Sequence, residues 1–142
     1  MKRVLLLSCL LSLAVACGSD SHSHVDAPAV DAGLVDAAPS RVIADTKTMA
    51  VTASLEGTFT AKKTDRIVIK LTSDGPIDWN VHGHANGVTT VVYGERGVMT
   101  ATYEFVPPAD GDWFLILTNK ATTAVSVQVH ADVYGTATFI WN

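Results

Sequence analysis

An alternation of apolar and polar residues with a period of two constrains this chain more than any other feature. It runs from about residue 46 to the C-terminus, and Gly, Asp and Pro residues interrupt it at intervals of roughly ten residues. Such runs bury one face of a sheet, because successive side chains of a strand point to opposite faces. β-branched residues dominate and no window has a helical stripe, which favours strands. We therefore expect an all-β fold, a single antiparallel β-sandwich of about eight or nine strands. The expected inward-facing positions include Met49, Val51, Ala53, Phe59, Ile67, Ile69, Leu71, Ile77, Trp79, Val81, Met99, Ala101, Tyr103, Phe105, Trp113, Leu115 and Leu117.

The aromatic residues show where a core can form. Every Trp, Tyr and Phe lies from Phe59 onward, and residues 18–45 contain none. A chain of 142 residues has room for one domain, and only its C-terminal part can bury a core. The predicted β-sandwich domain therefore covers residues 46–142. Both cysteines, Cys9 and Cys17, precede it, so the domain cannot use a disulfide, a blue-copper thiolate or a thiol nucleophile.

The first sixteen residues have the layout of a signal peptide. Lys2 and Arg3 are followed by an apolar run over residues 4–15, which is shorter than the roughly 20 residues of a membrane span. The run ends in Leu13-Ala14-Val15-Ala16-Cys17-Gly18, which resembles a bacterial lipobox. This resemblance implies cleavage after residue 16 and lipid attachment to Cys17, and a Gly after the cysteine implies the outer membrane. The alternative is ordinary secretion, because Ala14 and Ala16 also satisfy the general signal peptidase.

Residues 17–45 read as the lipidated cysteine and a disordered tether. They consist mainly of Ser, His, Asp, Ala and Pro, and Val-Asp-Ala recurs every five residues from Val25. So little apolar surface cannot offset the conformational entropy that folding removes. The net charge of the whole chain is −4, and no basic stripe is present. This balance argues against nucleic acid as a partner.

Candidate metal ligands gather near the middle of the domain. On a strand, Trp79 and Val81 face the core, while Asp78, His82 and His84 project from the other face. Two imidazoles at positions i and i+2 of one face can share Zn²⁺ or Cu²⁺. Besides Asp78, the candidates for a further ligand are Glu95, His130 and Asp132. In the alternative interpretation, which we favour, the domain has no cofactor. Both histidines are then polar residues on a solvated sheet face, or they form hydrogen bonds with a loop such as residues 85–87.

A second resemblance covers the segment Phe105-Val106-Pro107-Pro108-Ala109-Asp110-Gly111-Asp112-Trp113-Phe114-Leu115-Ile116-Leu117-Thr118-Asn119. It is similar to a motif of GOLD-type (emp24-like) β-sandwiches, in which a Gly-aromatic strand leads into an Asn and then a β-branched strand. The cysteine pair of the eukaryotic members is absent here. The resemblance implies a binding or adaptor module.

We expect a protein without enzymatic activity. The chain has no nucleophile elbow, no phosphate-binding glycine loop and no His-Glu-x-x-His. Trp79 and Trp113 lie in registers that predict burial, whereas Trp141 is close enough to the C-terminus to be partly covered. The favoured function is a lipoprotein of the bacterial cell envelope, held to the membrane through Cys17, whose tethered β-sandwich is a binding or structural module for an envelope protein or glycan. The alternative is a Zn- or Cu-binding lipoprotein that uses His82 and His84.

Overall fold

The computed structural model describes residues 37–142. The predicted signal peptide, Cys17 and most of the predicted tether lie outside this range. No helix in the part of the chain that the structure describes is long and apolar enough to cross a membrane. All strand pairs are antiparallel, so the predicted all-β class is confirmed. The strands are β1 (Arg41–Met49), β2 (Ser54–Ala61), β3 (Arg66–Ala85), β4 (Val88–Phe105), β5 (Gly111–Asn119), β6 (Val125–Tyr134) and β7 (Thr138–Trp141).

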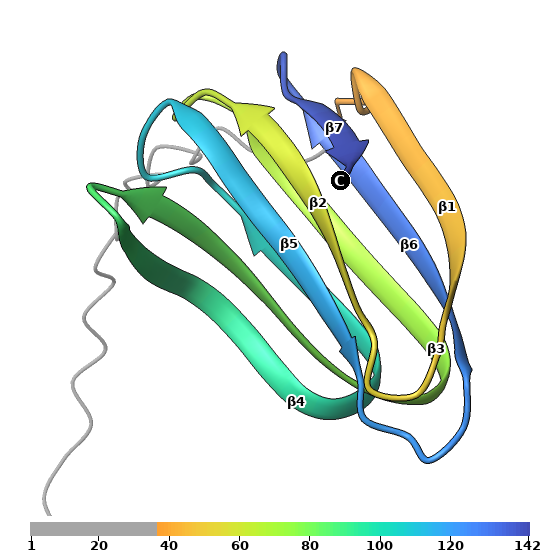
Figure 1. Ribbon diagram of the computed structural model, residues 1–142. Helices are drawn as coiled ribbons and strands as arrows, with labels where there is room; N and C mark the ends of the chain where they lie inside the picture. The colour runs from red at the N-terminus through yellow and green to blue at the C-terminus, as the bar shows by residue number, and fades with distance from the viewer. Residues whose placement is uncertain (1–36) are drawn as a thin grey trace, which may run out of the picture. The chain divides into compact units, whose positions relative to one another are not determined.

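Two long strands, β3 and β4, connect the two layers of the sandwich (Figure 1). The first half of β3, residues 66–73, pairs with β6, and the second half, residues 77–83, pairs with β5. Strand β4 follows β3 along both halves. One layer is therefore β1, β6 and the first half of β3 with the second half of β4, and we call it the β6 sheet. The other, the β5 sheet, is β7, β2, β5 and the second half of β3 with the first half of β4.

Residues 73–76 form a corner inside the continuous strand β3. Ser73 Oγ donates a hydrogen bond to Gly75 O at 2.6 Å. A Cβ at Gly75 would lie 2.7 Å from Val125 Cγ2. Pro76 has no N–H for a strand ladder, and the register with β4 shifts between Thr72 and Ile77. Because the chain passes through this corner without leaving the sheet, seven strands replace the expected eight or nine.

Alternate residues of the strands fill the space between the sheets, as predicted. Phe59, Ile67, Ile69, Leu71, Ile77, Trp79, Val81, Phe105, Leu115 and Leu117 are all buried. Two positions that were expected to face inward are exposed. Val51 is 46% exposed because it lies in the turn after β1, and Met99 is 50% exposed next to the corner of β4. Residues 37–142 have a hydrophobic core of their own and can be studied as a separate domain.

The domain begins earlier than residue 46, the expected boundary. Strand β1 starts at Arg41, and Arg41 to Asp45 pair with Val133 to Val129 of β6. This segment has no aromatic residue and alternates between exposed and half-buried positions. It is held through the backbone ladder at an edge of the sheet, so hydrophobicity alone could not reveal it.

Side chains close both open sides of the sandwich. Trp141 of β7 donates its indole N–H to Asp45 Oδ2 of β1 at 2.8 Å, and Lys47 forms an ion pair with the same oxygen at 2.9 Å. This contact joins the edge strands of the two sheets. At the other side, the rings of Tyr93 and Tyr103, one from each half of β4, stack with centroids 4.1 Å apart.

Asn119 ties the loops at one end of the sandwich together. Its side chain is 1% exposed. The amide nitrogen donates to the carbonyl oxygens of Met49, Ala50 and Thr123 at 2.8–3.2 Å, and Oδ1 accepts from the Ala121 N–H at 2.7 Å. These bonds connect the end of β1 and the loop that follows it to the loop between β5 and β6.

Asn119→Ala should therefore destabilise residues 37–142 by about 2–3 kcal/mol, since it removes a buried hydrogen bond to Met49 O and three partly buried ones. Urea denaturation followed by tryptophan fluorescence measures the change. Thr123→Ala is the control, because it keeps the carbonyl that Asn119 contacts, and it should change stability by less than about 0.5 kcal/mol. Equal effects of the two substitutions would contradict this role.

Candidate functional site

His82 and His84 lie next to each other on the outer face of the β5 sheet. Their ring centroids are 5.0 Å apart. His84 is exposed, but His82 is only 6% exposed, so the expectation that both histidines lie on a solvated face is wrong for His82. The ring of Phe114, its cross-strand neighbour on β5, stacks on His82 with centroids 5.4 Å apart and also contacts His84.

Burial fixes the orientation and the protonation of His82. Its Nδ1 is hydrogen bonded to Asn80 Oδ1 at 2.8 Å, and its Nε2 lies 3.8 Å from Glu56 Oε2. Desolvation lowers the pKa of His82 below its usual 6.5, and the neighbouring His84 lowers it further, while Glu56 opposes the shift. The ring is therefore neutral near neutral pH.

The other predicted metal ligands do not join the histidines. Asp78 accepts a hydrogen bond from the Gly97 N–H at 2.9 Å and lies 3.7 Å from Lys120 Nζ. Glu95 accepts hydrogen bonds from Trp79 and from the Tyr93 hydroxyl.

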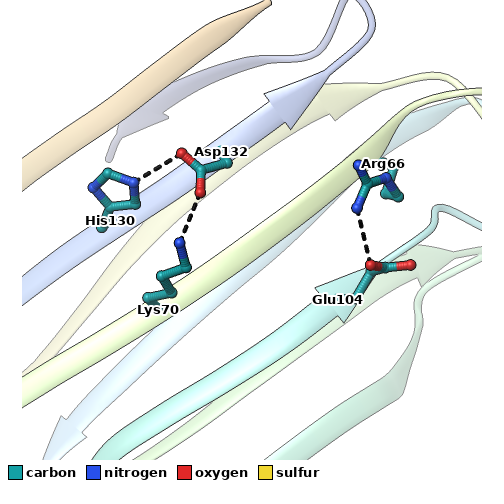
Figure 2. A network of polar contacts seen from close by, with 5 residues as sticks. All are labelled: Arg66, Lys70, Glu104, His130 and Asp132. Atoms are coloured by element: carbon teal, nitrogen blue, oxygen red, sulfur yellow. Dashed lines mark hydrogen bonds and ion pairs between the residues drawn. The ribbon is translucent and has the colours of Figure 1, made fainter. Parts of the chain in front are cut away.

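His130 and Asp132 lie on the β6 sheet, where they contact each other at 2.8 Å. Figure 2 shows Lys70 on the other oxygen of Asp132, and the separate pair of Arg66 with Glu104. Within residues 37–142, no group of three or more His, Cys, Asp or Glu side chains could hold a metal ion. The metal-binding alternative therefore depends on two imidazoles alone.

A hollow of about 350 Å³ lies beside Asp78. Its acidic groups, Asp78 and Glu95, are occupied by the contacts above. Both oxygens of each carboxylate already have a partner, so neither carboxylate is free to bind a ligand.

The hollow that includes His84 lies where the β3–β4 hairpin meets the start of β5. It has a volume of about 310 Å³ and is lined by Gly83, His84, Thr90, Asp110, Asp112 and Trp113, among others. We call it the Trp113 hollow. Its size is at the lower end of the range for small-molecule sites.

Trp113 was predicted to be buried in the core, but it is only half-buried. Its indole N–H donates to Ala109 O at 3.1 Å, which fixes the ring beside the loop before β5. Gly83 is its cross-strand partner, and a Cβ there would lie 2.7 Å from Trp113 Cζ3. The sequence signal was present in the residues before Trp113, since Asp110, Gly111 and Asp112 form a polar strand start where burial is incomplete.

Hydrogen bonds from neighbouring residues hold two carboxylates near Trp113 in place. Asp110 Oδ1 accepts from the Lys63 N–H at 2.8 Å, and Asp112 Oδ1 accepts from the Thr60 hydroxyl at 2.7 Å. In the described part of the chain, the second oxygen of each carboxylate has no hydrogen-bond partner. One hydrogen bond therefore fixes each carboxylate, and alternation along β5 places the Asp112 side chain on the face of the sheet opposite to Trp113.

The tip of the β3–β4 hairpin contributes His84 and Thr90 to the lining of the hollow. Because His84 pairs with Thr89 and Thr90 pairs with Gly83, the side chains of His84 and Thr90 point to opposite faces of the sheet. Asn86 and Gly87 have φ of 53° and 76°, the left-handed backbone of a type I′ turn. This turn sets His84 opposite Thr89, whose hydroxyl lies 3.0 Å from His84 Nδ1.

Comparison with known proteins supports the fold but not a function. No family model matches the chain, and no curated protein does, so the resemblance to GOLD-type sandwiches stays a prediction. Among solved structures, the chain is similar to the crystal structure of the Yersinia pseudotuberculosis-derived mitogen. The TM-score is 0.50 and the identity 10%, over 69% of this chain and 97% of that one. At this identity, the likeness shows a shared all-β fold and nothing more.

His82 should make the domain sensitive to mild acid. Its pKa is lowered in the folded state, so the unfolded chain binds the proton more readily. The stability that neutral His82 contributes is complete above its unfolded pKa of 6.5 and is lost as pH falls through the folded pKa. We expect the urea midpoint to fall between about pH 7.5 and about pH 5, and to fall less in His82→Gln.

His130→Gln, on the β6 sheet, is the matched control and should keep the fall of the wild-type protein. The carboxyl groups of Asp45 and Asp132 have pKa values lowered from 3.8, so their contribution is lost only at more acidic pH. If His82→Gln and wild type lose equal stability over this range, His82 does not cause the acid sensitivity.

Gly83→Ala should displace Trp113, because the new methyl group would overlap the indole. We expect a loss of about 1–3 kcal/mol of stability, as for other overpacked sites. The loss should be smaller in a Trp113→Phe background, where the ring is shorter. A double-mutant cycle by urea denaturation measures this coupling, and full additivity would show that Gly83 and Trp113 do not constrain each other.

Proposed function

We propose that this protein is a lipoprotein of the bacterial cell envelope, anchored through Cys17 and sorted to the outer membrane, whose β-sandwich is a non-enzymatic binding module. The observation that supports a binding role most directly is the Trp113 hollow. It is a mainly apolar recess of about 310 Å³ whose lining includes the half-buried Trp113 and the exposed Asp110 and Asp112. A mainly apolar recess with a few convergent polar groups is typical of ligand sites. The proposed partner is a component of the envelope, either a protein or a glycan.

The contacts within the hollow favour binding over catalysis. Asp110 accepts a hydrogen bond from the backbone N–H of Lys63, and Asp112 accepts one from the Thr60 hydroxyl. Both contacts stabilise the local structure. His84 is bonded to the Thr89 hydroxyl, and no carboxylate among the described residues orients its ring as a general base requires.

The anchor is supported by the sequence alone. Small residues precede Cys17, and an apolar run of signal-peptide length precedes them. Two or three acyl chains on one cysteine hold a protein stably to a bilayer, whereas one chain is marginal.

Cys17→Ser should abolish lipidation and move the protein from the detergent phase to the aqueous phase in a Triton X-114 partition of the host cells. Cys9→Ser is the matched control, since Cys9 lies inside the predicted signal peptide, and it should partition as wild type does. Mass spectrometry of the mature wild-type protein gives the second readout. An unmodified N-terminal Cys17 would show ordinary secretion and overturn the anchor.

Capture from detergent-solubilised envelopes tests the binding module. Immobilised residues 37–142 should retain an envelope component that an Asp112→Ala, His84→Ala double variant loses. The control is His130→Ala, which changes the β6 sheet and should retain the component. Retention that is equal in all three proteins, or absent from wild type, would contradict binding through the Trp113 hollow.

A further inference from the structure

Strand β4 leaves one of its edges unpaired along its whole length. Among the described strands it pairs with β3 alone, and it lies on the outside of the fold (Figure 1). The other two edge strands are protected in ways that are common in natural sheets. Strand β1 has charged side chains, which include Asp45 and Lys47, and β7 has only four residues. A side-chain contact between Trp141 and Asp45 also joins these two edges.

The first part of the β4 edge has little of this protection. Residues 88–94 read Val-Thr-Thr-Val-Val-Tyr-Gly and contain no charged residue and no Pro. Val88 and Val91 are 61% and 57% exposed. Within this segment, the register with β3 shifts between Val81 and His82, which leaves Val92 as an extra residue. The edge is therefore regular from Val88 to Val91, and an unpaired regular edge accepts another strand.

The turn at the tip of the hairpin shows which backbone groups face this edge. A two-residue type I′ turn closes on a hydrogen-bonded pair, which here is Ala85 with Val88. Hydrogen-bonded and non-hydrogen-bonded pairs alternate along an antiparallel ladder. The N–H and C=O groups of Thr89 and Val91 therefore point away from β3. No other segment of residues 37–142 forms a hydrogen bond with them.

We propose that this edge pairs with the same edge of a second copy of the chain, so that the β5 sheets of two molecules form one continuous sheet. A two-fold axis makes the two β4 strands antiparallel, like every strand pair within the fold. With Thr90 opposite its counterpart, Thr89 and Val91 of each copy exchange backbone hydrogen bonds with Val91 and Thr89 of the other. Val88 then lies opposite Val92 at both ends of the contact.

The side chains along the edge suit a second copy as the partner. Self-pairing about a two-fold axis brings any charge near the axis close to an identical charge, which is destabilising. Residues 88–92 contain no charge, and β-branched residues such as Val and Thr pair well across strands. The contact also covers Val88 and Val91. It is a small interface, so the dimer should form and dissociate as the protein concentration changes.

Cysteine cross-linking tests the register. Both natural cysteines precede residue 37, so residues 37–142 contain no thiol. Thr90→Cys places two thiols opposite each other at the axis, with Cα atoms about 4.5 Å apart, within the range of disulfides. Under mild oxidation it should give a covalent dimer in non-reducing electrophoresis. Thr102→Cys is the matched control, because Thr102 is also exposed on β4 but lies in the β6 sheet, and it should stay mainly monomeric.

Sedimentation velocity of residues 37–142 tests the association without a cross-link. The sedimentation coefficient should rise with protein concentration. Val91→Lys places two like charges near the axis and should raise the dimer dissociation constant by at least about tenfold. Val42→Lys is the control, since Val42 is an exposed valine on the edge strand β1, and it should associate as wild type does. Equal urea midpoints of the two variants verify that both fold.

Two results would overturn the proposal. In the first, wild-type protein stays monomeric at every concentration and Thr90→Cys cross-links no better than Thr102→Cys, which excludes a second copy even if a different extended strand binds the edge. In the second, Val42→Lys disrupts a dimer that Val91→Lys leaves intact, which would place the interface on β1. Neither result changes the expected capture through the Trp113 hollow, so the two proposals fail independently.

Discussion

The corner at residues 73–76 is the constraint on which the rest of this structure depends. Strand β3 has a paired strand on both edges up to Thr72 and again at Ile77, but across the corner its partner on one edge changes from β6 to β5. Because β4 follows β3 through the same corner, one hairpin becomes part of both sheets. On one side of the sandwich, the backbone and the strand hydrogen bonds therefore continue from one sheet into the other. On the other side, β1 and β7 meet through the contact of Asp45 with Trp141.

This arrangement also determines where the Trp113 hollow forms. The pairing of Gly83 with Trp113 brings the tip of the β3–β4 hairpin next to the loop that enters β5. Each side of the recess is rigid for a local reason. The type I′ turn fixes the hairpin, and hydrogen bonds from Lys63 and Thr60 fix the two carboxylates. Preorganised groups of this kind reduce the entropy cost of binding a small ligand.

Part of the candidate site was accessible to sequence reasoning. The outward direction of His82 and His84 follows from the alternation around Trp79 and Val81, and the structure places the two rings side by side. Asp78, the third candidate ligand, lies 3.7 Å from Lys120 Nζ and accepts a hydrogen bond from the Gly97 N–H. His130 and Asp132 are on the other sheet. An alternation with a period of two assigns each residue to one face of its strand, but it does not show which strands belong to the same sheet. The burial of His82 depends on Phe114 and Glu56, which come from other strands.

The sequence by itself determined the all-β class, the antiparallel strands and most of the core, because alternation is a local property of each strand and the aromatic residues mark the part that can bury a core. Tertiary structure decided the rest. The start of the domain at Arg41 depends on backbone pairing with β6, and a ladder bond does not require an apolar side chain. The bend of β3, the half-exposure of Trp113 and the recess beside it depend on which strands become neighbours. That choice is made by contacts far apart in the chain, which no local pattern encodes.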